Sequence, residues 1–239
     1  MENIEAIVEN ANKSLKIDKI STIGIITTLV LSCAYPLSFL ASILFIIWKI
    51  YIRKKKAVFL SYSITPEERK IINEKMDPLK KIARSSNIWE IIQSKAVADK
   101  KYSAGATSLV KRINCSSSMT FPFPFKSNEM PICFKSKNIK LVFLPDVLFI
   151  IKGGKIYFDT YSNSTISLSG TRFVESEKVP SDAKVIDKTW KYVNKSGAAD
   201  KRFSDNRQLP VCLYGKLTIQ SKINNIVLMF SNSDVQNEL

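Results

Sequence analysis

The sequence predicts an α+β fold in which helices come first and an antiparallel β region follows. Two observations carry this prediction. Residues 20–48 form an uncharged apolar segment that precedes a stretch with clear helix signals. From Ile132 onward, short runs of β-branched and aromatic residues alternate with turn residues. Since the connections between these runs are short, we expect an antiparallel barrel or sandwich rather than βαβ units.

Residues 20–52 predict a membrane anchor, formed by either one transmembrane helix or a re-entrant hairpin. No residue between Lys19 and Lys49 is charged. One crossing requires about 20 apolar residues and two crossings roughly twice as many. Pro36, near the middle, either kinks a single helix or marks the tip of a re-entrant hairpin. The denser apolar character of the second half favours a single span over the hairpin and over a buried core helix.

Aromatic and basic residues follow the apolar segment and predict its orientation. Aromatic rings at this position suit the headgroup layer, and basic residues favour the cytoplasmic side. The polar N-terminus, residues 1–19, carries charges of both signs instead. We therefore expect an inner-membrane protein, single-pass or re-entrant, with its main part in the cytoplasm. The expected membrane-interface residues are Trp48, Tyr51, Arg53, Lys54, Lys55 and Lys56.

Residues 53–104 predict a basic juxtamembrane segment followed by a short helical pair. Thr65 suits an N-cap and Pro66 the first helical position. An apolar face continues after the "SSN" at residues 85–87, which predicts the second helix around Ile88–Ile92. Residues 105–131, rich in Ser, Pro and Phe, predict a connector. Its alternating phenylalanines form either an exposed docking strip or, as we favour, a strand with its rings turned toward a sheet.

Residues 132–239 predict the antiparallel β domain. Gly153-Gly154 stands between "LFIIK" and "KIYFDTY", a pattern typical of a two-residue β-hairpin turn. A long polar loop is expected at residues 195–210. Two further strands, "VCLYGKLTIQS" and "NNIVLMFS", close the domain, and "NSDVQNEL" predicts a short final helix.

The stretch "LVFLPDVLFIIKGGKIYFDTYSNSTISL", with the late strands "LYGKLTIQS" and "IVLMFS", resembles bacterial PH-like domains. The resemblance covers roughly residues 130–239. The loop at 195–210 is longer, and the closing helix shorter, than this family's plan. The resemblance implies a cytoplasmic interaction module at a membrane, which in some members binds lipid headgroups, and it does not imply an enzyme.

Composition limits the chemistry that this chain can perform. There is no histidine among 239 residues, which removes histidine-based catalysis and most zinc or iron sites. The four cysteines lie far apart in the sequence and form no CxxC pair. We therefore expect no enzyme activity, no metal and no cofactor. The formal net charge of +15 favours polyanionic partners such as anionic lipid.

Two segments carry candidate ligand-binding residues. The first is the glycine turn, where basic residues flank a backbone that could approach an anion. The second is the polar loop, where planar donors follow the aromatic "TWKYV". The alternative in both cases is local structure: an ordinary hairpin turn, and a loop that satisfies its own hydrogen bonds. The candidates are Lys152, Gly153, Gly154, Lys155, Trp190, Arg202, Asn206, Arg207 and Gln208.

Two functions remain open at this point. The first is a membrane-anchored interaction or sensor protein that binds a protein partner or an anionic ligand. The second is a membrane-disrupting effector of a toxin or phage-defence system, in which the β domain senses or oligomerises and the apolar segment disrupts the bilayer. The hydroxyl groups of that segment then either line a polar path in an oligomer or bond to their own backbone. The expected partners are the lipid bilayer with its anionic headgroups, an unidentified protein, and a second copy of the chain. Nucleic acid has no recognised motif to support it.

Overall fold

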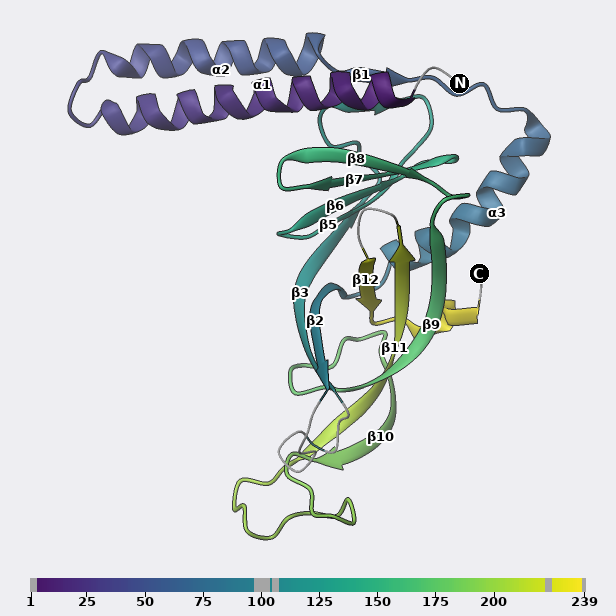
Figure 1. Cartoon of the computed structure of the whole chain (residues 1–239). Coiled ribbons are helices and arrows are strands. Elements are labelled where there is room, and N and C mark those ends of the chain that lie inside the picture. Colours follow the sequence, from purple (N-terminus) through teal and green to yellow (C-terminus); the bar gives the residue numbers. More distant parts are fainter. Residues whose placement is uncertain (1–3, 97–103, 105–107, 222–224, 238–239) are drawn as a thin grey trace. The chain divides into compact units, whose positions relative to one another are not determined.

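A computed structural model describes residues 4–96, 104, 108–221 and 225–237 (Figure 1). Residues 1–3, 97–103, 105–107, 222–224 and 238–239 lie outside this description. The predictions for the polar N-terminus, the helical pair, the connector and the β domain are therefore compared with the structure only over their other residues. The α+β prediction is confirmed: three N-terminal helices precede a large antiparallel β-sheet. The chain forms two compact units. The first comprises Met1–Thr65, Met119–Cys133 and Asn138–Phe158, and the second Pro66–Ser118, Phe134–Lys137 and Asp159–Leu239.

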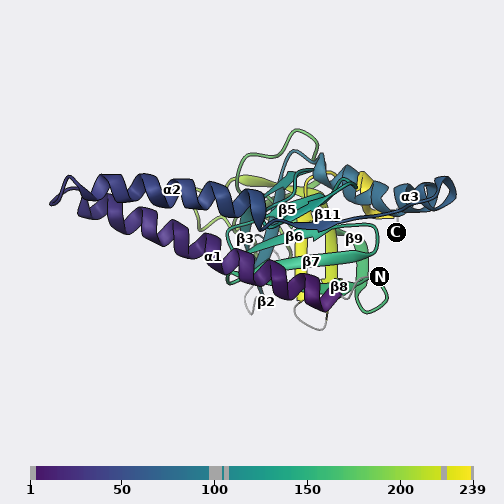
Figure 2. The same ribbon diagram turned by 90° about the horizontal axis from the view of Figure 1, so that it is seen from above.

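A helical hairpin dominates the first unit. Helix α1 (Ile4–Leu31) and helix α2 (Ser38–Lys55) run antiparallel, joined by a tip that contains Pro36 (Figure 2). A single continuous helix over residues 20–52 is therefore wrong, and the alternative with Pro36 at a hairpin tip is correct. Proline cannot donate to a helical ladder, and serine hydroxyls on both sides of the tip bond to backbone carbonyls of the turn region. None of the described helices is both long enough and apolar enough to cross a membrane.

The strands of the first unit pack against the N-terminal half of α1. Strands β6 (Ile139–Phe143), β7 (Val147–Lys152) and β8 (Lys155–Thr160) are adjacent in the sheet. Strand β8 belongs to the first unit up to Phe158. Strand β1 (Val58–Leu60) pairs in parallel with β4 (Phe125–Ser127). Buried side chains of these strands form one core with Ala11, and Ile4, Ile7, Val8 and Leu15 of α1 pack against it. Half of α1 is thus a core helix.

Two of the three alternating phenylalanines of the predicted connector turn toward this core. Phe125 is buried and stacks on Phe149, with ring centroids 4.4 Å apart. Phe121 packs at the edge of the same cluster. Phe123 lies under the Arg53 guanidinium, 5.8 Å from it.

Antiparallel strands form most of the second unit, together with helix α3 (Pro66–Ala83). The strands are β2 (Ile88–Ala96), β3 (Ser108–Ser118), β9 (Thr165–Val174), β10 (Lys184–Trp190), β11 (Gln208–Gln220) and β12 (Asn225–Phe230). They are ordered β10-β11-β12-β2-β3, and β9 pairs with β11 along most of its length. The predicted closing helix is a short 3-10 turn, Ser233–Asn237. Strand β5 (Ile132–Lys135) is divided between the two units.

Two sequence-based expectations for this region are wrong. The second member of the helical pair is strand β2, and part of the predicted 105–131 connector is strand β3. Ile88, Ile91 and Ile92 suit a helix face and a strand equally in a short run, but their β-branched side chains favour the strand. Pairing of β2 with both β12 and β3 satisfies the backbone on each side and decides the outcome.

A buried ion pair lies in the core of the second unit. The guanidinium of Arg112 makes two hydrogen bonds of 2.9 Å to the carboxylate of Glu175. Its carbon lies 4.3 Å from the ring centroid of Trp89 and 4.7 Å from that of Phe173. Tyr214 donates a further hydrogen bond of 2.8 Å to Glu175. The Glu175 side chain is only 1% exposed, so both of its oxygens depend on these partners.

Gly215 should resist substitution because Phe230 covers it. The two residues face each other across β11 and β12, and a Cβ at Gly215 would lie 2.1 Å from the Phe230 ring. We expect Gly215→Ala to lower the free energy of unfolding by about 1–3 kcal/mol, because the fully buried ring must move. Chemical denaturation measures this. Combining it with Phe230→Leu should cost less than the sum of the two single changes, and strict additivity would contradict the explanation.

Candidate membrane-binding site

The seam between α1 and α2 is small and polar. A Cβ at Gly24 would lie 2.5 Å from the Phe45 ring, so the glycine permits close approach of the two helices. Ser42, which is fully buried, donates a hydrogen bond of 2.9 Å to the Thr28 hydroxyl across the seam. The Thr28 hydroxyl in turn donates to the Gly24 carbonyl at 2.7 Å. Small residues and interhelical hydroxyl bonds are typical of helix pairs in lipid.

The outer surface of the same hairpin is apolar and exposed. A helix pair in water normally turns its apolar face inward and its polar face outward. Here the arrangement is reversed, since the hydroxyls lie at the seam or bond to their own helix while large aliphatic side chains face outward. The exposed apolar residues of the helices are Ile20, Ile23, Ile26, Leu29, Val30, Leu31, Phe39, Leu40, Ile43, Leu44, Ile46, Ile47 and Ile50.

An ion pair closes the base of the hairpin, where the apolar surface begins. The Arg53 Nε lies 2.7 Å from Oδ1 of Asp18, and the Asp18 side chain is only 12% exposed. One turn nearer the tip, the Lys49 ammonium donates to the Thr22 hydroxyl. We call this region, residues 16–22 and 48–56, the neck. Its two cross-links tie the helices together at the point where α1 leaves the β-structure.

The predicted membrane-interface residues all lie at the neck. Trp48 and Tyr51 are exposed, and Trp48 also contacts the Phe45 ring at a centroid distance of 6.0 Å. Lys54, Lys55 and Lys56 are exposed at the end of α2, whereas Arg53 bonds to Asp18. Aromatic and basic side chains therefore lie at the end of α2, where the apolar hairpin meets the polar remainder of the unit.

The predicted glycine turn is confirmed, and it lies close to the neck. Gly153 and Gly154 join β7 to β8 with φ angles of 60° and 78°, a conformation that glycine adopts without strain. Lys152 and Lys155 flank them and are exposed. A methyl group at Gly154 would lie 3.8 Å from the ammonium nitrogen of Lys19. The turn therefore gains a third basic residue, one that no local sequence pattern relates to it.

Asn12 fixes the distance between α1 and this turn. Its side-chain amide donates to the Ile156 carbonyl at 3.0 Å, and its oxygen accepts from the Ile156 N–H at 2.8 Å. The Asn12 side chain thus pairs with the backbone of β8 as the backbone of a neighbouring strand would. Because Lys19 is two helical turns further along α1, its position over the turn is set by a rigid element.

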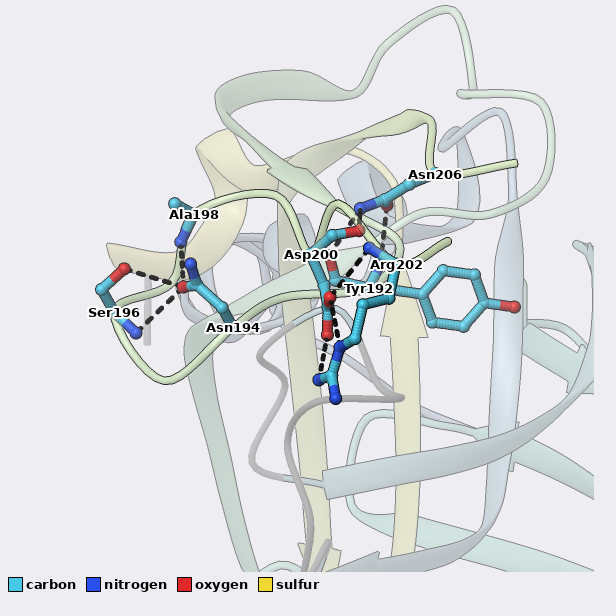
Figure 3. Close-up of polar contacts among 7 residues, drawn as sticks. All are labelled: Tyr192, Asn194, Ser196, Ala198, Asp200, Arg202 and Asn206. Carbon is cyan, nitrogen blue, oxygen red and sulfur yellow. Dashed lines mark hydrogen bonds and ion pairs between the residues drawn. The ribbon is translucent and has the colours of Figure 1, made fainter. Parts of the chain in front are cut away.

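The polar loop of the second unit satisfies its own hydrogen bonds (Figure 3). The Asn194 side chain accepts from Ser196 and from the Ala198 N–H. The Arg202 guanidinium pairs with Asp200 at 2.7 Å. Asn206 donates to the carbonyls of Tyr192 and Asp200 and accepts from the Tyr192 N–H. Such bonds order a long loop.

The predicted ligand residues of this loop are accordingly engaged in local structure. Arg202 and Asn206 hold the loop, and Gln208 opens β11 in register with Trp190 of β10. The backbone carbonyl of Arg207 accepts a hydrogen bond from the Lys191 N–H, and the Arg207 side chain is exposed. The structure brings these residues together but gives each except Arg207 a structural role. They belong to the second unit, and the glycine turn belongs to the first.

The described residues include all four cysteines and several carboxylates. Among them, no cluster of three or more cysteine or carboxylate side chains could hold a metal ion. Cys115, Cys133 and Cys212 are buried, whereas Cys33 is exposed at the hairpin tip. Burial, together with the nearby charge of Glu90, raises the pKa of Cys115 to about 12, which makes its thiol a poor nucleophile.

Comparison with protein-family models, with curated proteins and with solved structures found no match to this chain, so its function has to be argued from its own residues.

Proposed function

We propose that this chain is a membrane-docked interaction or sensor protein whose helical hairpin inserts into a lipid layer. The observation that carries the proposal is the reversed polarity of the hairpin: hydroxyl groups at the seam, and aliphatic side chains outside. Exposed apolar surface of this extent marks an interaction site. Lipid suits it, because aliphatic side chains cover the whole outer surface of both helices rather than one docking face.

The dimensions of the hairpin favour partial insertion. From Ile20 to Leu31, α1 extends about 18 Å at 1.5 Å per residue. The hydrocarbon core of a bilayer is about 30 Å thick. A hairpin of this length reaches past one leaflet without emerging on the other side. This favours the re-entrant anchor over the single pass and keeps both ends of the chain on one side of the membrane, which we propose is the cytoplasmic side.

The β-structure then serves as the interaction module. Its antiparallel strands support a PH-like fold, which stays a proposal, whereas the short terminal 3-10 turn departs from that family's plan. We propose that it binds a protein partner or an anionic ligand at the membrane surface, without catalytic activity, metal or cofactor.

The alternative, a membrane-disrupting effector, finds less support. It needs hydroxyl groups facing an aqueous path, but Thr27, Thr28 and Ser42 bond to their own helix or across the seam. Toxicity on expression that disappears when residues 20–48 are deleted would favour this alternative.

The native Cys33 provides the test. It is the exposed cysteine among the four, so a membrane-impermeant maleimide should label the folded chain at this residue. Lipid vesicles should protect Cys33 because the hairpin tip enters hydrocarbon. The matched control is a Cys33→Ser chain that carries Asp234→Cys, an exposed position in the second unit, and its labelling should not change. A Cys33 that stays fully reactive with vesicles would contradict insertion.

A further inference from the structure

We infer that Lys19, Lys152 and Lys155 form a binding site for the phosphate of an anionic membrane lipid, at the base of the hairpin. This inference rests on the proposed function and specifies its ligand. The three residues are called the neck lysines below, because Lys19 belongs to the neck and the turn that carries Lys152 and Lys155 lies beside Lys19. They come from two elements, α1 and the β7–β8 turn, that are 133 residues apart in sequence between Lys19 and Lys152.

The convergence of these elements is fixed by bonds already described. The paired hydrogen bonds between Asn12 and Ile156 hold α1 beside β8. Two helical turns later, the Lys19 ammonium lies 3.8 Å from where a Cβ of Gly154 would be. The Lys19 ammonium thus lies beside the backbone of the turn, which Lys152 and Lys155 flank on both sides. Such an arrangement of like charges is favourable when an anion lies among them.

The turn leaves space for that anion. Gly153 and Gly154 carry no side chains, and a Cβ built at Gly153 would meet no atom within 4 Å. A phosphate can therefore approach the backbone as well as the ammonium groups. Both glycines and all three lysines are exposed, so a headgroup has access from outside.

The depth of the site fits a lipid better than a soluble anion. Lys19 is followed directly by Ile20, the first exposed residue of the apolar hairpin. When the hairpin is in hydrocarbon, the neck lysines lie at the level of the lipid phosphates. Basic side chains near an anionic surface each contribute about 1 kcal/mol to binding.

The test compares two full-length variants that lose the same charge. The first carries Lys19→Gln, Lys152→Gln and Lys155→Gln. The matched control carries Lys184→Gln, Lys188→Gln and Lys195→Gln, which are exposed positions of the second unit. Flotation measures binding to vesicles of phosphatidylcholine, and to vesicles in which half of it is replaced by phosphatidylglycerol. The neck variant should bind the anionic vesicles on the order of 100-fold more weakly than the parent chain, and the control within about threefold of it.

The outcomes separate this inference from the proposed function. If the parent chain floats with neither kind of vesicle, the proposed function fails. If it floats but both variants lose the same affinity, or neither loses any, insertion stands and the neck site is wrong. Inorganic phosphate should compete no better than sodium chloride of equal ionic strength. If it alone displaces the parent chain, the site belongs to a free phosphate ion and not to a lipid.

Discussion

Replacing Ile26 and Leu44 together by aspartate should abolish binding of the chain to lipid vesicles. Both side chains lie in the middle of the exposed apolar surface, at 57% and 68% exposure. A charged side chain in the hydrocarbon costs about 2.5–3.5 kcal/mol, so two should weaken partitioning on the order of a thousandfold or more. Flotation with phosphatidylcholine vesicles measures the loss without the contribution of lipid charge.

The same pair of substitutions should leave the fold intact, because exposed positions carry little of the free energy of folding in water. Circular dichroism and denaturation of the variant should therefore match those of the parent chain. The matched control is Val185→Asp with Ile186→Asp, two exposed apolar positions on β10. If the control loses vesicle binding equally, adhesion is a general property of exposed apolar residues and the hairpin has no special role.

Replacing Glu175 by glutamine should destabilise the second unit by about 3–5 kcal/mol, because the buried Arg112 guanidinium then keeps only the exposed Glu177 carboxylate, 3.1 Å away, as a counter-charge. Chemical denaturation measures the loss. Arg112→Met should cost a similar amount, and the double variant less than the sum, because no lone charge then remains. The matched control is Asp187→Asn, which breaks the exposed pair with Arg172 and should cost less than about 1 kcal/mol.

Acid should reproduce the effect of the Glu175 substitution. Burial disfavours the Glu175 carboxylate, but hydrogen bonds from Arg112, from the Glu177 N–H and from Tyr214 outweigh burial and lower its pKa below the ordinary 4.5. A carboxyl with a lowered pKa contributes its stability above the pKa of the unfolded chain, and this is lost as pH falls through the folded pKa. As the pH falls below about 5, the free energy of unfolding should therefore decrease more in the parent chain than in the Glu175→Gln variant. Equal losses would contradict the role of this carboxylate.

The sequence allows the local features of this protein to be predicted and leaves the long-range ones open. The turn at Gly153-Gly154 follows from two glycines between two strand-like runs, and the start of α3 from Thr65-Pro66. The choice between one helix and a hairpin at Pro36 does not, because both satisfy the same hydropathy. The hairpin becomes evident only from contacts such as Asp18 with Arg53.

The candidate site shows the same division. Lys152 and Lys155 can be selected from the sequence because they flank a recognisable turn. Lys19 cannot, because its relation to the turn depends on Asn12 meeting Ile156. For Arg202 and Asn206 the sequence allows both a ligand site and a self-bonded loop, and it favours the loop because long loops need internal bonds. Only the observed bonds to Asp200 and Tyr192 show that the loop uses these side chains for itself.

The sequence separation of Asn12 and Ile156 also determines when this contact can form during synthesis of the chain. Its two ends are 144 residues apart, whereas the contacts along the hairpin seam join residues that are close in sequence. During synthesis the hairpin can close as soon as α2 has left the ribosome, long before β8 exists to hold its base. The nascent chain therefore presents a finished apolar hairpin on an unfolded tether. If the hairpin inserts into lipid as proposed, insertion has the whole remaining translation time in which to occur, before the β-structure folds.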